Sequence, residues 1–125
     1  MLDHASIGVR DVAAAGRFYD AALGALGFTR LVDGAEALGY GRETAVFWVC
    51  AASRPVAADP ESGLHFGFTA PDRACVDAFH AAALGTGGGD NGAPGLRPDY
   101  GPTYYAAFVT DPDGYRLEAC CVSVA

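Results

Sequence analysis

The strongest constraint on the fold is an internal repeat, because residues 4–24 align with residues 65–85 without a gap. The matched positions include His4 with His65, Asp11 with Asp72, Phe18 with Phe79, and the tetrapeptide AALG at 21–24 with the same tetrapeptide at 82–85. A repeated segment of this kind indicates a duplicated supersecondary unit. We therefore expect two copies of one small unit in series, each with a histidine at the same point.

Each copy opens with a short stretch whose apolar and polar residues alternate, which predicts a strand. Ala5, Ile7 and Val9 alternate with His4, Ser6 and Gly8, and Leu64, Phe66 and Phe68 alternate with His65, Gly67 and Thr69. The apolar face is expected to pack on the helix that follows. The histidine face, lined with small residues, is expected to look away from the helix toward a space where a ligand fits.

A helix is predicted after each strand. Asp11 and Asp72 each precede apolar residues at helical spacing, as N-cap residues do. Gly24 and Gly85 stand where a left-handed C-cap residue belongs. The two helices therefore have predicted bounds at both ends.

The remainder of each copy predicts strands. Residues 28–34 and 44–52 form these segments in the first half, and residues 104–109 and 115–122, joined by the turn TDPDG, form them in the second. The fold class is therefore α+β, with two βαβββ modules in one domain. Module one covers 1–52, a Pro- and Ser-containing linker covers 53–63, and module two covers 64–125.

The glycine-rich segment GTGGGDNG at 85–92 has a composition typical of phosphate loops. Such loops follow a strand and open a helix, whereas this one follows a helix, so a phosphate site is not expected. Two alternatives stay open for residues 85–102: a mobile surface loop, or a lid over the histidine face.

Glu118 lies in the middle of an otherwise apolar final strand, on the face shared by Arg116 and Cys120. Burying a carboxylate is costly unless it is paired or binds a cation. Glu118 therefore needs a partner.

Composition narrows the classes of partner and the compartment. The net charge is -7, with eight arginines and no lysine, which argues against nucleic acid or anionic membrane and leaves a small molecule or another protein. Asp3 follows the first residues with no basic and apolar leader, so a cytoplasmic location is expected. In that reducing compartment the four cysteines are expected to be core residues rather than disulfides.

Three motifs carry a resemblance to a known family: DHASIGVRD with RFYDAALG, then LHFGF, then FVTDPDGYRLEA near the C-terminus. Together they are similar to the vicinal oxygen chelate superfamily, which includes glyoxalase I, extradiol dioxygenases and bleomycin-resistance proteins. The resemblance extends from Leu2 to about Val122. It implies two βαβββ modules whose sheets curl into a half-barrel around a divalent metal.

Carried over residue by residue, the resemblance implies three metal ligands: His4, His65 and Glu118. The fourth ligand position falls on Trp48, which cannot bind a metal. Two histidines and one carboxylate suit Fe(II), Mn(II), Ni(II) or Zn(II) with open positions for substrate. Glu118 is the expected catalytic group, and the expected substrate pocket is formed by Trp48, Tyr100, Tyr104 and Tyr105.

The resemblance implies a metalloprotein, acting as a homodimer, that chelates neighbouring oxygens of a small metabolite in lyase, isomerase or dioxygenase-type chemistry. A typical glyoxalase I is not expected, because Trp48 replaces a glutamate and Gly8 replaces the arginine that binds the glutathione carboxylate. The alternative is a metal-free binding protein of the bleomycin-resistance type. In that case the acidic charge would suit a cationic ligand.

Overall fold

The computed structural model describes residues 1–124 and contains eight strands and two helices. In chain order these are β1 (Ala5–Val9), α1 (Val12–Gly24), β2 (Thr29–Asp33), β3 (Ala37–Gly41), β4 (Ala45–Ala51), β5 (Phe66–Thr69), α2 (Arg73–Gly85), β6 (Gly89–Leu96), β7 (Tyr105–Thr110) and β8 (Arg116–Cys121). The prediction of two βαβββ modules is confirmed.

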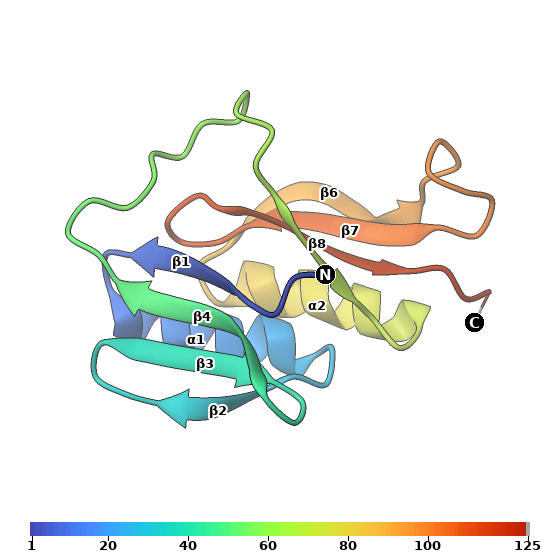
Figure 1. The fold of residues 1–125 in the computed structure, drawn as a ribbon. Coiled ribbons are helices and arrows are strands. Elements are labelled where there is room, and N and C mark those ends of the chain that lie inside the picture. The colour runs from blue at the N-terminus through green and yellow to red at the C-terminus, as the bar shows by residue number, and fades with distance from the viewer. Residues whose placement is uncertain (125) are drawn as a thin grey trace.

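The two modules form two four-stranded mixed sheets of identical topology. The first sheet has the order β1-β4-β3-β2 and the second has the order β5-β8-β7-β6 (Figure 1). In each sheet the first strand pairs in parallel with the last, so Ala5 lies beside Phe47 and Gly67 lies beside Glu118. Because the module begins and ends on neighbouring strands, residues distant in sequence meet along that strand pair in each sheet.

Both helices begin where the sequence predicts. The Asp11 carboxylate accepts a hydrogen bond from the Ala14 amide at 3.0 Å, and the Asp72 carboxylate accepts one from the Cys75 amide at 2.8 Å. These bonds satisfy amide groups that the first turn of a helix leaves without partners.

The predicted left-handed C-caps are wrong by two or three residues. Gly24 and Gly85 are the last helical residues, and the left-handed residues are Gly27 (φ 89°) and Gly87 (φ 98°). After α1 the Phe28 amide reaches back to the carbonyl of Leu23 at 3.0 Å, which is the hydrogen bond of a Schellman motif. The chain therefore continues for part of a turn before the glycine reverses its direction.

Residues 89–96 of the glycine-rich segment form strand β6, the edge strand of the second sheet, and not a free loop; that residues 85–102 act as a lid stays a prediction. β6 pairs antiparallel with β7 but shifts register twice, between Asp90 and Gly92 and between Gly92 and Gly95. Gly92 approaches the Phe108 side chain so closely that an added Cβ would lie 3.0 Å from it. The glycines of β6 allow its β-bulges and the close approach of the strand to its neighbour.

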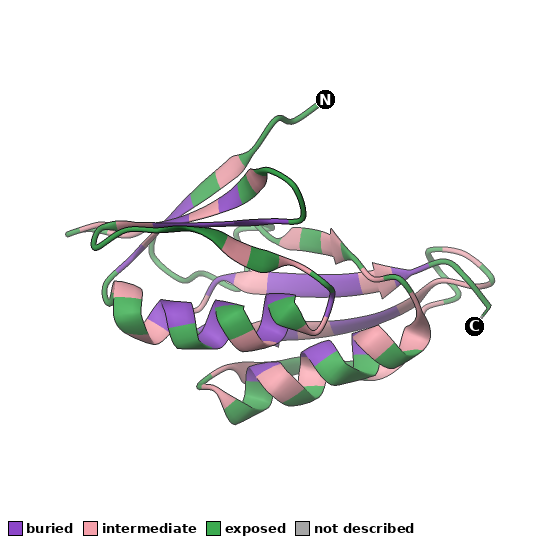
Figure 2. Cartoon of the chain, turned by 90° about the horizontal axis from the view of Figure 1, so that it is seen from below, coloured by how far each residue is buried: buried purple, intermediate pink, exposed green. Residues whose placement is uncertain are grey.

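Both helices cover the same side of the sheets and enclose one hydrophobic core that both modules share (Figure 2). The ring of Phe47 on β4 lies 5.7 Å from the ring of Phe66 and 5.1 Å from the ring of Phe68, both on β5. The apolar faces predicted from alternation are therefore the faces that join the modules. The opposite faces of the sheets are not covered by the two helices (Figure 2).

The turn between β7 and β8 ties module two to module one. The buried Tyr19 hydroxyl of α1 donates to Asp111 Oδ2 at 2.6 Å, and the Tyr115 hydroxyl donates to the carbonyl of Gly8 at 2.7 Å. Asp111 is 4% exposed, so its carboxyl group lies inside the protein. The turn thus fixes the relative position of α1 and the second sheet.

All four cysteines are free thiols, and only Cys121 is fully buried. Within residues 1–124, neither helix has the length and apolar character that crossing a membrane requires.

Candidate functional site

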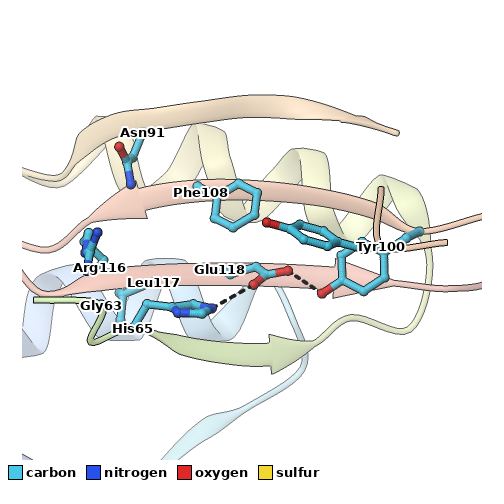
Figure 3. A pocket seen from close by; sticks show the side chains of 9 residues that line it. Gly63, His65, Asn91, Tyr100, Phe108, Arg116, Leu117 and Glu118 are labelled. Atoms are coloured by element: carbon cyan, nitrogen blue, oxygen red, sulfur yellow. Dashed lines mark hydrogen bonds and ion pairs between the residues drawn. The ribbon is translucent and has the colours of Figure 1, made fainter. Parts of the chain in front are cut away.

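The open face of the second sheet carries a hollow of about 490 Å³, which is within the size range of small-molecule sites. β8 contributes its centre, β6 and β7 contribute one side, and Gly63 and His65, which precede β5, contribute the other (Figure 3). Its lining residues are Gly63, His65, Asn91, Tyr100, Tyr104, Phe108, Arg116, Leu117 and Glu118.

A histidine and a carboxylate are paired on the floor of this hollow. His65 Nε2 lies 3.2 Å from Glu118 Oε1. Glu118 is 5% exposed, whereas half of the His65 side chain is exposed to solvent. The small residue Gly67 lies beside Glu118 across the parallel β5/β8 pair and leaves room for the carboxylate. The sequence predicts that Glu118 needs a partner, and in the structure that partner is His65.

The second oxygen of Glu118 is also occupied. The Tyr104 hydroxyl donates a hydrogen bond to Glu118 Oε2, and the Tyr100 ring packs edge-on against the Tyr104 ring at 5.4 Å. Burial raises the pKa of Tyr104, and hydrogen bonds to Cys120 and Glu118 raise it further. Tyr104 is thus a neutral hydrogen-bond donor that orients the carboxylate toward His65.

The His65–Glu118 pair has a separation that suits two ligands of one divalent ion. Two donors at about 2.1 Å from a metal are roughly 3.0 to 3.4 Å apart in octahedral or tetrahedral geometry, and the observed distance is 3.2 Å. Within residues 1–124, however, no group of three His, Cys, Asp or Glu side chains converges on one point. His65 and Glu118 are thus donor types that suit a divalent metal, without a complete ligand group among these residues.

His4 does not join this pair. Its Nδ1 atom lies 2.8 Å from Asp3 Oδ1, and 53% of its side chain is exposed. His4 borders a neighbouring hollow of about 320 Å³ between the start of β1 and strand β5, and His65 borders that hollow as well. His65 therefore stands between His4 on one side and Glu118 on the other.

Two residues predicted to line the pocket lie elsewhere. Trp48 is on β4 in the first sheet, where it covers Gly39, and it does not line the hollow of Glu118. The Tyr105 hydroxyl donates to Asp77 on α2 at 2.7 Å, so Tyr105 faces the helix side of its sheet. The structure thus brings together His65, Glu118, Tyr100 and Tyr104, and leaves His4, Trp48 and Tyr105 outside the group.

Sequence reasoning did not select five residues of the hollow: Gly63, Asn91, Phe108, Arg116 and Leu117. Arg116 shares a strand face with Glu118, and that alternation is the signal that could have included it. Phe108 is the direct neighbour of Glu118 across the β7/β8 pair. Asn91 lies in the glycine-rich segment, which has no strand alternation to orient it.

The fold and this site define a class of protein: a small tandem βαβββ domain with a hollow of mixed polar and aromatic lining on an open sheet face. Residues 1–119 match the model of the Glyoxalase/Bleomycin resistance protein/Dioxygenase superfamily. The chain belongs to this superfamily.

Solved structures agree with this assignment. A glyoxalase/bleomycin resistance protein from Albidiferax ferrireducens T118 is 32% identical, with a TM-score of 0.85, covering 96% of this chain and 98% of that one. A fosfomycin resistance protein FosX from Mesorhizobium loti shares the fold at 16% identity, with a TM-score of 0.68, covering 96% of this chain and 90% of that one. A comparison with curated proteins finds no match.

Proposed function

We propose that the chain is a metal-dependent enzyme in which His65 and Glu118 bind a divalent ion and His4 supplies the third protein ligand. The observation that carries this proposal is the buried Glu118 carboxylate, whose Oε1 lies 3.2 Å from an imidazole nitrogen. When bound, the ion would supply Lewis-acid polarisation of substrate oxygens. The substrate class is a small oxygen-rich molecule that fits a hollow of about 490 Å³.

The chain's own residues have distinct roles in this proposal. The Tyr104 hydroxyl keeps one Glu118 oxygen in place and leaves the other directed at His65. A carboxylate held in this way can accept a proton from a substrate in the hollow. Phe108 and Tyr100 line the adjoining walls.

The third ligand requires either a rearrangement of the first residues or a second copy of the chain. His4 is largely exposed, and its partner is the adjacent residue Asp3. The His4 imidazole is therefore accessible to a site in a second copy of the chain. We infer a homodimer in which the sites are shared between copies. Mixing His4→Ala chains with His65→Ala chains should restore metal binding at one site of each hybrid dimer if sites are shared, and at none if each chain is self-contained.

The decisive test is elemental analysis of the purified protein and two variants. The wild type should carry close to one equivalent of metal per chain, and His65→Ala should lose most of it while keeping the fold. His80→Ala is the matched control, because His80 pairs with Asp90 outside the hollow at 2.9 Å and should not affect metal content. Equal metal content in the wild type and His65→Ala would refute the proposed ligand.

The second candidate is a metal-free binding protein, favoured by the fact that both Glu118 oxygens already have hydrogen-bond partners in the chain. In that case the wild type purified without chelator would contain no stoichiometric metal, and chelator would leave ligand affinity unchanged. Loss of ligand affinity on chelation would exclude this candidate.

A further inference from the structure

We propose that the Glu118 hollow recognises an anionic group of its ligand through the Arg116 guanidinium, so that the ligand is a flat acid with its reacting oxygen at the far end. This inference deepens the proposed function by assigning a ligand class to the same hollow. It rests on the position and bonding of Arg116 and not on the presence of a metal.

The guanidinium of Arg116 is held in place by the backbone. Its Nε donates to the carbonyl of Leu64 at 3.2 Å, and its Nη1 donates to the carbonyl of Pro60 at 2.6 Å. A guanidinium has five N–H donors, so these two bonds leave three. Among residues 1–124, no carboxylate lies within ion-pair distance of Arg116, although the chain has almost twice as many acidic as basic residues. A positioned cation with free donors at the wall of a hollow is suited to a carboxylate or phosphate.

The other residues at this end of the hollow support the same reading. Figure 3 shows Asn91 and Arg116 at one end, Tyr100 at the other, and His65 and Glu118 between them. The Asn91 amide has no hydrogen-bond partner among residues 1–124 and offers a second donor.

The spacing along β8 sets the shape of the ligand. Arg116 and Glu118 are two residues apart on one strand face, so their Cα atoms are about 7 Å apart. An acid bound at Arg116 therefore stays clear of the Glu118 carboxylate, while a hydroxyl on the opposite side of a six-membered ring reaches the His65–Glu118 pair. Phe108, the cross-strand neighbour of Glu118, provides an aromatic surface that favours a flat ring between these two points.

This local arrangement opposes the expectation from net charge. A net charge of -7 would attract cations to the protein as a whole. Direct contacts in a hollow act at shorter range than that overall field, and the only acidic residue lining this hollow is Glu118. The charge of the preferred ligand is therefore set by Arg116.

The test compares three probes of the same shape: 4-hydroxybenzoate, the neutral 4-hydroxybenzamide, and the cationic 4-hydroxybenzylamine. Affinities are measured by chemical-shift titration of the ¹⁵N-labelled protein, which also reports the fold, with and without chelator. The wild type should prefer the acid to the amide by about tenfold or more, since charge-assisted bonds are roughly twice as strong as neutral ones. Arg116→Gln should reduce that preference to less than about threefold.

Two further variants separate recognition from structure. Arg17→Gln removes the same charge from the exposed surface of α1 and should keep the wild-type preference. Arg116→Lys retains the charge without the planar fork and should fall between the wild type and Arg116→Gln. If the Arg116 side chain only clamps residues 60–64, its replacement will weaken the acid and the amide equally.

Equal weakening of both probes in Arg116→Gln, which leaves the acid-to-amide ratio unchanged, would overturn the proposal. In the wild type, a preference for the amine or no preference for the acid would also overturn it, and so would a failure of both the acid and the amide to bind. A ratio that persists in chelator together with a metal-free protein would support anion recognition and reject the metal proposal. A metal-loaded protein without acid preference would support the metal proposal and reject anion recognition.

Discussion

Replacing Tyr19 with Phe tests whether the buried Tyr19–Asp111 hydrogen bond joins the two modules energetically. The ring of Tyr19 is fully buried, packs edge-on against Phe18 at 4.9 Å, and packs in a tilted arrangement against Phe47 at 5.4 Å. Phenylalanine preserves these contacts and removes only the hydroxyl that donates to Asp111 Oδ2 at 2.6 Å. The variant therefore isolates one hydrogen bond at the junction of α1 with the β7–β8 turn.

The expected cost follows from what remains around Asp111. Its Oδ1 atom keeps two backbone donors, the amides of Asp113 at 2.9 Å and Tyr115 at 2.8 Å, but Oδ2 loses its hydroxyl partner inside the protein. Hydrogen bonds to charged groups contribute about 1.5 to 3 kcal/mol, and we expect Tyr19→Phe to lower the free energy of unfolding by about 2 kcal/mol at pH 7. That is a substantial part of the roughly 5 to 15 kcal/mol typical of a domain.

The cost should depend on pH in a defined direction. Burial raises the pKa of Asp111 above its ordinary value, while the hydrogen bonds from Tyr19 and Tyr115 oppose that rise. A carboxyl whose pKa is raised by folding contributes stability that is present in acid and is lost as the pH rises through the folded pKa. Removing the Tyr19 donor raises the folded pKa further, so the cost of Tyr19→Phe should shrink as the pH falls from 7 toward about 4.

Urea unfolding of four proteins measures this coupling: the wild type, Tyr19→Phe, Asp111→Asn and the double variant. An asparagine at 111 carries no charge, so Tyr19→Phe should cost less in that background and its cost should not vary with pH. Tyr100→Phe, at an exposed tyrosine, is the control and should change stability by less than about 0.5 kcal/mol. A Tyr19→Phe cost below 0.5 kcal/mol at pH 7, or one that grows in acid, would refute the reasoning.

Two further stability predictions concern the backbone and the helix start. Gly41→Ala should cost about 1 to 3 kcal/mol in urea unfolding, because the added Cβ would lie 1.8 Å from the backbone carbonyl oxygen of Thr44. Gly24→Ala is its control, since nothing lies within 4 Å of that Cβ, and should be neutral or slightly stabilising; equal losses in the two variants would contradict the clash. Asp11→Ala should cost about 1 kcal/mol through loss of the helix cap, and Asp11→Ser should restore most of it; a serine variant as unstable as the alanine variant would argue against capping.

The elements that the sequence predicted well are those whose physical cause is local. Alternation along residues 4–9 and 64–69 orients each first strand, and an aspartate three residues before a helical amide caps each helix. The repeat then requires that the second module copy the first. The two βαβββ modules are therefore confirmed in the structure.

Strand β6 was missed because its cause is not local. Its residues GDNGAPGL have low strand propensity and no alternation, and they form a strand only because β7 offers a partner edge. The φ of 151° at Gly92 and its close approach to Phe108 both favour glycine there, so the composition that suggests a loop in sequence suits the packing of a strand.

In the candidate site, too, some residue positions have a local cause and others do not. A carboxylate on an apolar strand must find a partner, so the pairing of Glu118 could be anticipated from the energetic cost of burying it alone, and His65 meets that need at 3.2 Å. The positions of Trp48 and Tyr105 could not be anticipated, since they depend on which face of which sheet is covered by a helix. Arg116 illustrates both cases: strand alternation places it beside Glu118, but only the structure shows that backbone carbonyls at 60 and 64 hold its guanidinium at the wall of the hollow.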